Sequence, residues 1–244
     1  MKLSVIGSGN MGGALIKGWI RSKADLSITI TAHTQKTLDR FKAEYPQLDC
    51  TLDNREAVAK ADVVVLAVKP WLVDSVIAEI TEALEGKILI SVAANVRNER
   101  IDAYVMPNIA AEFGQSMTFV EKGDSPAVEQ ARDLFALVGE VMVVEPRQMA
   151  AGMMMAGCGI AYVMRFLRAM MEGGVEMGLY PADALRIAMQ TMEGAVTLLD
   201  QTGLHPEAAI DKVTTPGGIT IKGLNELDHA GFNSAVVRCL KAGL

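Results

Sequence analysis

The stretch KLSVIGSGNMGGALIKGWI, Lys2 to Ile20, decides the fold expected for this chain. It begins with a short apolar run, Leu3 to Ile6, that is typical of a β-strand, and it continues into the glycine-rich turn Gly7 to Gly12. Apolar residues then recur at helical spacing through Trp19. The order strand, glycine turn, helix predicts the first unit of an α/β domain.

The glycine turn has the spacing G-x-G-x-x-G, which is typical of dinucleotide-binding sites. In that pattern Gly7 permits a tight turn, Gly9 lets the backbone approach a pyrophosphate, and Gly12 lets the helix pack closely on the strand. The free N–H groups at the start of the helix would face the phosphates. Such spacing alone often marks only a turn, but the strand before it and the helix after it favour a cofactor site here.

Composition limits the class of protein. With 244 residues the chain has room for one large or two modest domains. Its net charge of −6 and its lack of a basic run argue against a protein that binds duplex nucleic acid. The cysteines, Cys50, Cys158 and Cys239, are far apart and form no C-x-x-C pair, so neither a disulfide framework nor a metal site is expected.

The start of the chain leaves no room for a signal peptide, because Met1 runs directly into the first expected strand. No window of the sequence is expected to be apolar over a length that spans a bilayer. We therefore expect a soluble cytoplasmic protein with reduced cysteines and no membrane partner.

The residues after a second expected strand, Ser27 to Ala32, distinguish the two nicotinamide cofactors. An NAD site usually has Asp or Glu about 20 residues after the glycine motif, where the carboxylate holds the ribose 2′-hydroxyl. This chain has His33, Thr34 and Lys36 in that region and no carboxylate to repel a 2′-phosphate. NADPH is therefore favoured, with NADH as the open alternative; the competing interpretation makes His33 and Lys36 solvated loop residues.

The next part of the chain continues the alternation of strands and helices. Strands are expected at 62–68, 87–93, 103–106, 117–120 and 140–144, and helices at 53–60, 71–84 and 125–138. Ligands of open α/β sheets bind outside the carboxyl ends of the strands, which is where Val68-Lys69-Pro70 and Ala93-Ala94 lie. Only about ten residues separate Asn95 from the next strand, which barely accommodates a crossover helix and argues against a complete βαβ unit there.

Everything after Arg147 has the pattern of helices. The segment Ala161 to Met177 is apolar around most of its circumference, and Pro181 to Gln201 carries an apolar stripe. Helices this apolar need partners on more than one side, which predicts a subunit interface as well as a core. The run Met153-Met154-Met155 is interpreted as adaptable packing rather than as a soft metal site.

The second informative stretch is Thr214 to Thr220, TTPGGIT. Thr215 is a good N-cap and Pro216 suits the first position of a helix that stops at Gly231. Two glycines in a first turn weaken a helix by roughly 1 kcal/mol each relative to alanine, so another requirement is expected to select them. Bare N–H groups at Gly217 and Gly218 would hold a small carboxylate; a plain Pro-Gly turn is the alternative.

Segments in a fixed order make the chain resemble the pyrroline-5-carboxylate reductase family over essentially its whole length. They are GSGNMG at 7–12, VKP at 68–70, SVAA at 91–94, MPN at 106–108, GCGIAY at 157–162 and VTTPGGITIKGL at 213–224. The resemblance implies an α/β N-terminal Rossmann domain with a mostly parallel sheet, residues 1–146, and an all-α C-terminal dimerisation domain, residues 147–244. It also implies NAD(P)H-dependent reduction of 1-pyrroline-5-carboxylate to L-proline, the last step of proline biosynthesis, by a homodimer or a larger homo-oligomer.

The resemblance also assigns site residues, position by position. It implies that the cofactor is lined by Gly9, Asn10, Met11, Val68, Lys69, Pro70, Ala93 and Ala94. The glycine motif adds Gly7 and Gly12 to the cofactor site. The resemblance implies that the substrate is bound by Thr215, Gly217, Gly218 and Thr220. A cyclic imine is readily protonated and accepts hydride without a metal, so positioning supplies most of the catalysis, with Thr220 as the candidate catalytic residue at the ring nitrogen.

The chain departs from the family pattern at a few positions. The family has SGSGPAY where this chain has AGCGIAY, Ala156 to Tyr162, so that hydroxyl and proline positions of the motif are lost. The family also has glycine where this chain has Asn95. The connection Val96 to Asp102 is also shorter. These departures concern substrate identity, rate and assembly.

Other functions stay open at this point. A related β-hydroxyacid-type dehydrogenase is expected to carry a catalytic lysine after the domain boundary, whereas Met153 to Met177 contains Arg165 and Arg168 but no lysine. An imine reductase with another substrate and a non-catalytic NADP-binding paralogue are the further alternatives.

Overall fold

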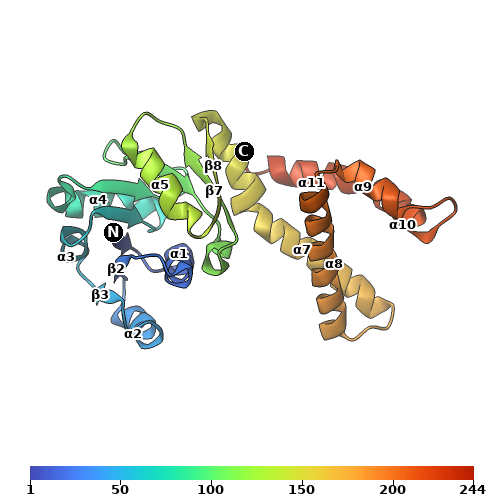
Figure 1. The fold of residues 1–244 in the computed structure, drawn as a ribbon, viewed down its shortest axis with the longest axis horizontal. Helices are drawn as coiled ribbons and strands as arrows, with labels where there is room; N and C mark the ends of the chain where they lie inside the picture. The colour runs from blue at the N-terminus through green and yellow to red at the C-terminus, as the bar shows by residue number, and fades with distance from the viewer. The chain divides into compact units, whose positions relative to one another are not determined.

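The computed structural model describes residues 1–244, which form two compact units, Met1–Cys158 and Gly159–Leu244 (Figure 1). The first unit is built on one eight-stranded sheet with the order β3-β2-β1-β4-β5-β6-β7-β8. Its strands are β1 Lys2–Ile6, β2 Ser27–Thr31, β3 Asp49–Thr51, β4 Val63–Leu66, β5 Ile88–Ser91, β6 Ala103–Met106, β7 Ser116–Glu121 and β8 Gly139–Val144. Neighbouring strands are parallel except for the antiparallel pair β6 and β7. The mostly parallel sheet predicted from the sequence is confirmed.

Helices cover both faces of this sheet. They are α1 Asn10–Ser22, α2 Gln35–Glu44, α3 Asn54–Ala59, α4 Val73–Ile80 and α5 Pro126–Ala136. Alternate residues of a strand point to opposite faces. Val63 and Val65 therefore pack in one core with α1, α2 and α5, and Val64 and Leu66 pack in the other with α3 and α4. All four valine and leucine side chains of β4 are buried, as expected for a strand covered on both faces.

The connection between β5 and β6 contains no helix, although the two strands are parallel. Side chains hold it against the sheet instead. The Leu89 N–H donates to Asp102 Oδ2 at 2.8 Å, and the Tyr104 hydroxyl donates to the Asn98 carbonyl at 3.0 Å. The expectation that this short segment does not complete a βαβ unit is therefore confirmed.

The second unit consists of helices only. They are α7 Gly159–Glu176, α8 Pro181–Thr202, α9 Pro206–Val213, α10 Ile219–His229 and α11 Phe232–Lys241. Helices α7 and α8 pack closely at Gly174, where an added Cβ would lie 3.0 Å from the Ala184 Cβ. Large apolar side chains such as Met177, Met189 and Val196 are exposed in the single chain.

Ahead of α7, the chain forms the short helix α6, Met149–Gly152, and a π-helical turn, Met153–Gly157. With the residues around them they make one helical run, Pro146–Glu176, that is long and apolar enough by length and composition to cross a membrane. An 18-residue window within the run has a mean hydropathy of 1.4. The expectation that no window reaches this length is wrong, because the sequence pattern treated 153–155 and 161–177 as separate pieces. One such helix is weak evidence for a membrane span, since apolar helices of soluble proteins meet the same criteria.

Candidate active site

The predicted cofactor residues follow four neighbouring parallel strands. Gly7–Gly12 follow β1, His33–Lys36 follow β2, Val68–Pro70 follow β4, and Ala93 and Ala94 follow β5. The carboxyl ends of parallel strands lie at the same edge of a sheet, so the structure brings these segments to one edge. The order of the strands reverses between β1 and β4, and ligands bind at such a switch point.

The glycines of the first turn fit the three roles assigned to them. Gly7 has a φ of 97°, and its N–H donates to Thr31 Oγ1 at 3.3 Å. A Cβ on Gly12 would lie 1.9 Å from the Gly7 carbonyl oxygen, so helix α1 packs directly on the turn. Gly9 is exposed, and a Cβ there would meet nothing within 4 Å. Of the three glycines, only Gly9 therefore has open space where a side chain would project.

The first turn of α1 carries unsatisfied donors. Gly9 is the N-cap residue and makes no side-chain cap, the turn contains no acidic side chain, and the first N–H bonded back to Gly9 is that of Gly13, at 2.7 Å. By helix geometry the N–H groups of Asn10 and Met11 have no acceptor within the helix. The Ser8 hydroxyl is buried and has no hydrogen-bond partner. These groups fit a diphosphate at the positive end of α1.

Ser8 was missed from the sequence. It occupies the variable position between Gly7 and Gly9, where the glycine pattern demands no particular residue, and its burial at 3 % exposure is set by neighbouring segments. Its Oγ is the second indication of a ligand at this turn, because an unsatisfied buried hydroxyl costs about 1–3 kcal/mol.

Of the residues after β2, Lys36 lies in the first turn of α2, whereas His33 lies in the bend before this helix. Thr34 is the N-cap residue without a side-chain cap, and its hydroxyl lies 3.1 Å from that of Thr37. His33 and Lys36 are exposed, and Lys36 makes no ion pair in the structure. The first turn of α2 contains no acidic side chain. A cation and a helix N-terminus therefore meet here, which suits an anionic group.

The segment after β4 turns sharply into a short 3-10 helix, Pro70–Leu72. Lys69 is its N-cap residue, and the Leu72 N–H donates to the Lys69 carbonyl at 2.9 Å. Val68 is half-buried and Lys69 is exposed at the same edge as Gly7. Both interpretations of Pro70 are compatible with this geometry, since it shapes the turn and lies at the cofactor edge.

A cavity of about 290 Å³ lies past the ends of β5 and β6. Its wall includes Ala93 and Asn95 together with Tyr104, Met106 and Met149. Behind it, Asn108 joins the sheet to the π-helical turn, because its Nδ2 donates to the Ala156 carbonyl at 3.3 Å while its Oδ1 accepts from the Ala110 N–H at 3.0 Å. The segment Met106–Asn108 therefore has a structural role, because Asn108 connects the sheet to the π-helical turn.

In the second unit, the glycine-rich segment differs from the expectation. Gly218 N–H donates to the Thr215 carbonyl at 2.9 Å, and Gly217 has a φ of 72°. With Pro216 at the second position, Thr215–Gly218 has the features of a type II turn. Helix α10 begins at Ile219 with Gly218 as its N-cap residue. The prediction that Thr215 caps a helix starting at Pro216 is wrong, because the positive φ of Gly217 is incompatible with a right-handed helix.

The free N–H groups of this segment are therefore not the ones expected from the sequence. The N–H of Gly218 is engaged in the turn and is not bare, contrary to the expectation. The first N–H groups of α10, those of Ile219 and Thr220, have no acceptor within the helix, and its first turn contains no acidic side chain. The Thr220 side chain is exposed and makes no hydrogen bond within the chain. The segment is both a Pro-Gly turn and the start of a helix that can receive an anion.

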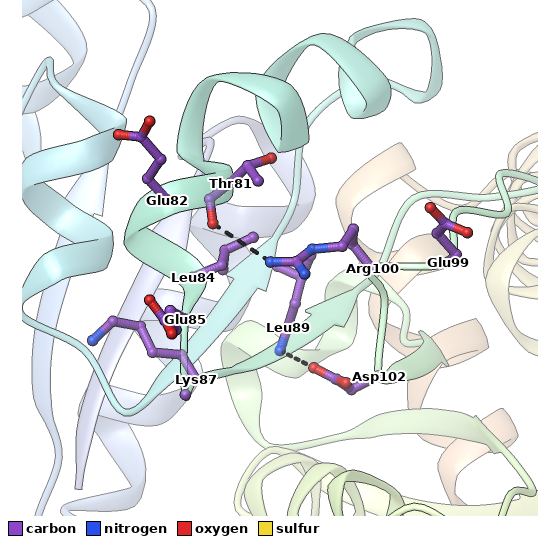
Figure 2. Close-up of a pocket in the computed structure, with 10 residues that line it drawn as sticks. Thr81, Glu82, Leu84, Glu85, Lys87, Leu89, Glu99, Arg100 and Asp102 are labelled. Atoms are coloured by element: carbon purple, nitrogen blue, oxygen red, sulfur yellow. Dashed lines mark hydrogen bonds between the residues drawn. The ribbon is translucent and has the colours of Figure 1, made fainter.

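A larger cavity, of about 480 Å³, lies at the amino end of β5 and contains none of the predicted site residues. Figure 2 shows Arg100 reaching the Thr81 carbonyl at 3.4 Å and Asp102 accepting from the Leu89 N–H. Its remaining charged side chains include Glu82, Glu85, Glu99 and Lys87. This cavity lies at the opposite edge of the sheet from the glycine turn.

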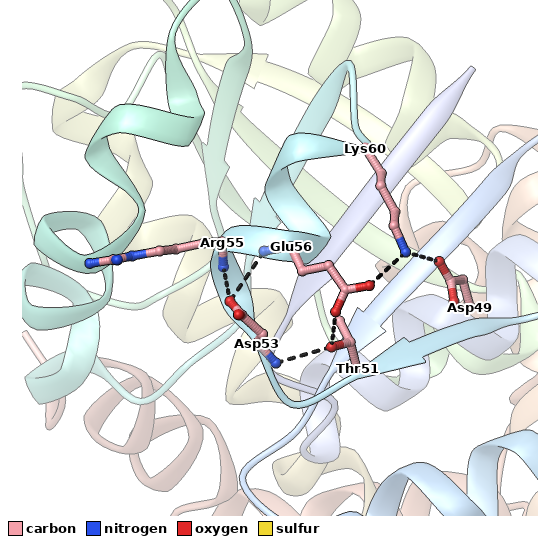
Figure 3. Close-up of polar contacts among 6 residues, drawn as sticks. All are labelled: Asp49, Thr51, Asp53, Arg55, Glu56 and Lys60. Atoms are coloured by element: carbon pink, nitrogen blue, oxygen red, sulfur yellow. Dashed lines mark hydrogen bonds and ion pairs between the residues drawn. The ribbon is translucent and has the colours of Figure 1, made fainter.

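A second polar cluster ties the edge strand β3 to α3 (Figure 3). Lys60 Nζ lies 2.8 Å from Glu56 Oε1 and 2.9 Å from Asp49 Oδ2, and the Thr51 hydroxyl donates to Glu56 Oε2 at 2.6 Å. These bonds lower the pKa of the Glu56 carboxyl and raise the pKa of Lys60. Asp53 caps α3 by accepting from two backbone N–H groups. The cluster is structural, and no group of three His, Cys, Asp or Glu side chains in the chain is arranged to hold a metal ion.

Comparisons with known proteins agree with this arrangement. A family model described as pyrroline-5-carboxylate reductase dimerisation matches residues 146–244, and one described as NADP oxidoreductase, coenzyme F420-dependent, matches residues 2–95. Pyrroline-5-carboxylate reductase 1 of Dictyostelium discoideum is 36% identical over 97% of this chain, which spans 47% of that protein. Pyrroline-5-carboxylate reductase of Corynebacterium melassecola is 32% identical over 98% of this chain and 95% of its own length.

Solved structures give the same picture. The pyrroline carboxylate reductase of Plasmodium falciparum, with NADP bound, has a TM-score of 0.88 and 25% identity, covering 100% of this chain and 95% of that one. The pyrroline-5-carboxylate reductase of Coxiella burnetii has a TM-score of 0.87 and 27% identity, covering 99% and 95%. An imine reductase of Streptomyces aurantiacus, at 16% identity and a TM-score of 0.57, shares the fold alone.

Proposed function

The chain belongs to the pyrroline-5-carboxylate reductase family, and from that premise we propose that it reduces 1-pyrroline-5-carboxylate to L-proline with NADPH. The observation that carries this assignment is the presence, in one chain, of a glycine turn at the switch point of the sheet and of the Thr215–Gly218 turn at the start of α10. The first suits a dinucleotide and the second suits a small carboxylate. Relatives of nearly full length carry the same activity in their names.

NADPH, when bound, supplies the hydride that the imine carbon accepts. The residues of the chain hold the cofactor in place for this transfer. The backbone N–H groups of Asn10 and Met11 and the Ser8 hydroxyl hold the diphosphate, and Lys36 with His33 and Thr34 holds the 2′-phosphate. Val68, Lys69 and Pro70 shape the edge between them. Ala93 and Ala94 have side chains small enough to leave room for a flat ring.

The substrate side of the reaction falls to the second unit. The N–H groups at the start of α10, beside Gly217 and Gly218, hold the carboxylate of the imine. Thr220 holds the proton of the ring nitrogen by its hydroxyl, so that the nitrogen stays protonated while the carbon receives the hydride. Because an iminium carbon is already electrophilic, holding the reactants in place accounts for most of the rate.

We further propose that residues 1–146 are the cofactor domain and residues 147–244 the dimerisation and substrate-binding domain of a cytoplasmic homodimer or larger homo-oligomer. The apolar helix Pro146–Glu176 then packs against a second copy of the chain rather than lipid. Two observations support this. The dimerisation model begins at residue 146, and the second half of the helix carries an exposed ion pair between Arg168 and Glu172, at 2.8 Å, which lipid would penalise.

A steady-state assay of NADPH oxidation with 1-pyrroline-5-carboxylate, with proline identified as the product, tests the function. NADPH binding without turnover would instead indicate a non-catalytic paralogue. Turnover of β-hydroxyacids with NADP⁺, or of another cyclic imine in preference, would indicate one of the other enzymes of this architecture.

A further inference from the structure

The cavity past the ends of β5 and β6 has a mixed lining, in which Ser91, Asn95, Arg97 and Tyr104 supply the polar side chains. Ala93, Met106, Met149 and Met153 contribute its apolar surface, and its volume is about 290 Å³. All of its lining residues belong to the first unit. A flat heteroaromatic ring with one polar substituent suits such a site, provided that one polar group on the wall meets the substituent.

Most polar side chains on the wall already have partners. Ser91 Oγ accepts from the Ala93 N–H at 3.2 Å. The Tyr104 hydroxyl donates to the Asn98 carbonyl and accepts from the Asn98 N–H at 2.7 Å. Arg97 pairs with Glu121 through two hydrogen bonds and lies 4.2 Å from the centre of the Tyr104 ring. The exception is Asn95, which is exposed and whose side-chain amide makes no hydrogen bond within the chain.

The backbone of Asn95 has a left-handed conformation. Its φ is 58°, and Lys23 is the one other residue besides glycine with a positive φ in this chain. Asparagine tolerates this left-handed conformation better than most residues, so it can stand where the family has glycine without a change in the path of the chain. The substitution therefore adds an amide to the wall and keeps the turn.

Sheet topology places this wall at the nicotinamide end of a dinucleotide. In dinucleotide-binding sheets of this kind the residues after β2 contact the ribose of the adenosine half, and the glycine turn after β1 binds the diphosphate. The other half of the cofactor extends the opposite way, over β4 and β5. Two strand spacings, about 10 Å, separate β1 from β5, and a nicotinamide riboside covers a comparable length.

We infer that the side-chain amide of Asn95 hydrogen-bonds the carboxamide of the nicotinamide ring and so fixes the rotation of that ring in the cavity. This inference rests on the proposed use of NADPH. An amide suits this task because it presents both a donor and an acceptor to the carboxamide, which also has both. Asn95 is in this sense a cofactor-positioning residue that the glycine of the family cannot replace.

The variant Asn95→Gly tests the inference, because glycine adopts the same φ without strain and lacks the amide. We expect the Kd of NADP⁺, measured by titration calorimetry on the whole protein, to rise between about two- and tenfold, as for one neutral hydrogen bond. The Kd of 2′,5′-ADP, which has the adenosine half without the nicotinamide, should stay unchanged. The variant Asn95→Asp, which keeps the backbone preference but loses the donor, should weaken NADP⁺ at least as much.

A cofactor analogue supplies the second arm. In 3-acetylpyridine adenine dinucleotide phosphate a methyl group replaces the amino group of the carboxamide. We compare, for each protein, the ratio of the Kd of this analogue to the Kd of NADP⁺. The ratio should be larger for wild type than for Asn95→Gly, because the variant lacks the amide that distinguishes the two ligands. Equal discrimination by both proteins, or an unchanged Kd of NADP⁺ with a raised KM for the imine, would overturn the inference and leave the proposed function intact. Failure of wild type to bind NADP⁺ at all would contradict the proposed function itself.

Discussion

A Cβ atom on Gly12 would lie 1.9 Å from the carbonyl oxygen of Gly7, whereas a Cβ on Gly9 would meet nothing within 4 Å. Two glycines of one turn therefore have separate physical roles. Gly12 permits the contact between α1 and the end of β1, and Gly9 keeps open the space that a diphosphate would occupy. The difference can be measured.

Gly12→Ala should destabilise the protein by about 3 kcal/mol or more, because the atom in conflict is backbone and cannot rotate away. Gly9→Ala should leave the unfolding midpoint close to wild type and weaken NADP⁺ binding by at least about tenfold. Thermal unfolding and calorimetric titration of both variants check this. Equal losses of stability in the two variants would contradict the assignment.

The second prediction concerns Lys36, which has no ion pair and lies at the start of α2. Lys36→Gln should lower kcat/KM for NADPH by roughly 10- to 100-fold, the effect of one charge-assisted hydrogen bond, and leave kcat/KM for NADH nearly unchanged. Lys23→Gln is the matched control, because Lys23 is an exposed cation at the C-terminus of α1, at the other edge of the sheet. A wild-type preference for NADH would refute the 2′-phosphate site altogether.

The third prediction follows from the cluster on β3 and α3. Hydrogen bonds from Lys60 and Thr51 lower the pKa of Glu56 below the usual 4.5. A carboxyl whose pKa is depressed in the folded state contributes stability above its unfolded pKa and loses it as the pH falls through the folded pKa. Glu56→Gln should therefore lower the melting temperature at pH 7, and the gap to wild type should close in acid below pH 4. A gap that stays constant across this range would show that the ionised carboxylate is not the stabilising group.

The sequence alone predicted the glycine turn and the strands that consist of consecutive apolar residues. Strand β4 is an example, because its residues are apolar on both faces of the sheet. The sequence did not reveal β3 and α2. Strand β3 has three residues, and α2 buries only Leu38 and Phe41, so each contributes few apolar residues from which an element could be predicted. The start of α10 was also predicted too early from local helix propensity. The positive φ of Gly217 prevents the helix from starting before Ile219, and this angle cannot be predicted from propensity. Asn95 and Ser8 required the structure because their importance depends on what surrounds them.

The fourth prediction is that the protein is at least a dimer through residues after Arg147. Val196 on α8 is 62% exposed in the single chain, so Val196→Asp should not disturb the core of one subunit. It should instead place a charge in an apolar interface and shift the sedimentation of the protein toward the monomer at micromolar concentration. Ala43→Asp, at an exposed position of α2, is the control and should sediment as wild type. A wild-type protein that is already monomeric would refute the interface.

The last prediction concerns Thr220 and Gly217, which flank the start of α10. Thr220→Ala removes the hydroxyl proposed to hold the imine nitrogen, so kcat should fall by about 10²-fold or more, and Thr220→Ser should restore most of it. Gly217→Ala should chiefly raise the KM for the imine, because the φ of 72° is strained for alanine and the turn beside the carboxylate shifts. Gly203→Ala carries a similar strain, at a φ of 62°, in a turn outside this segment, and should leave KM unchanged.

Neither Thr220→Ala nor Gly217→Ala should alter the Kd of NADPH, because the groups proposed to hold its phosphates, at Ser8 to Met11 and at Lys36, are in the first unit. Steady-state kinetics in both substrates, together with direct titration of the cofactor, separate the two sites. If Thr220→Ala weakened NADPH binding while turnover at saturating cofactor stayed at the wild-type rate, Thr220 would belong to the cofactor site. The protonated imine nitrogen would then need another acceptor for its N–H, because the proposed mechanism keeps this nitrogen protonated while the carbon receives the hydride.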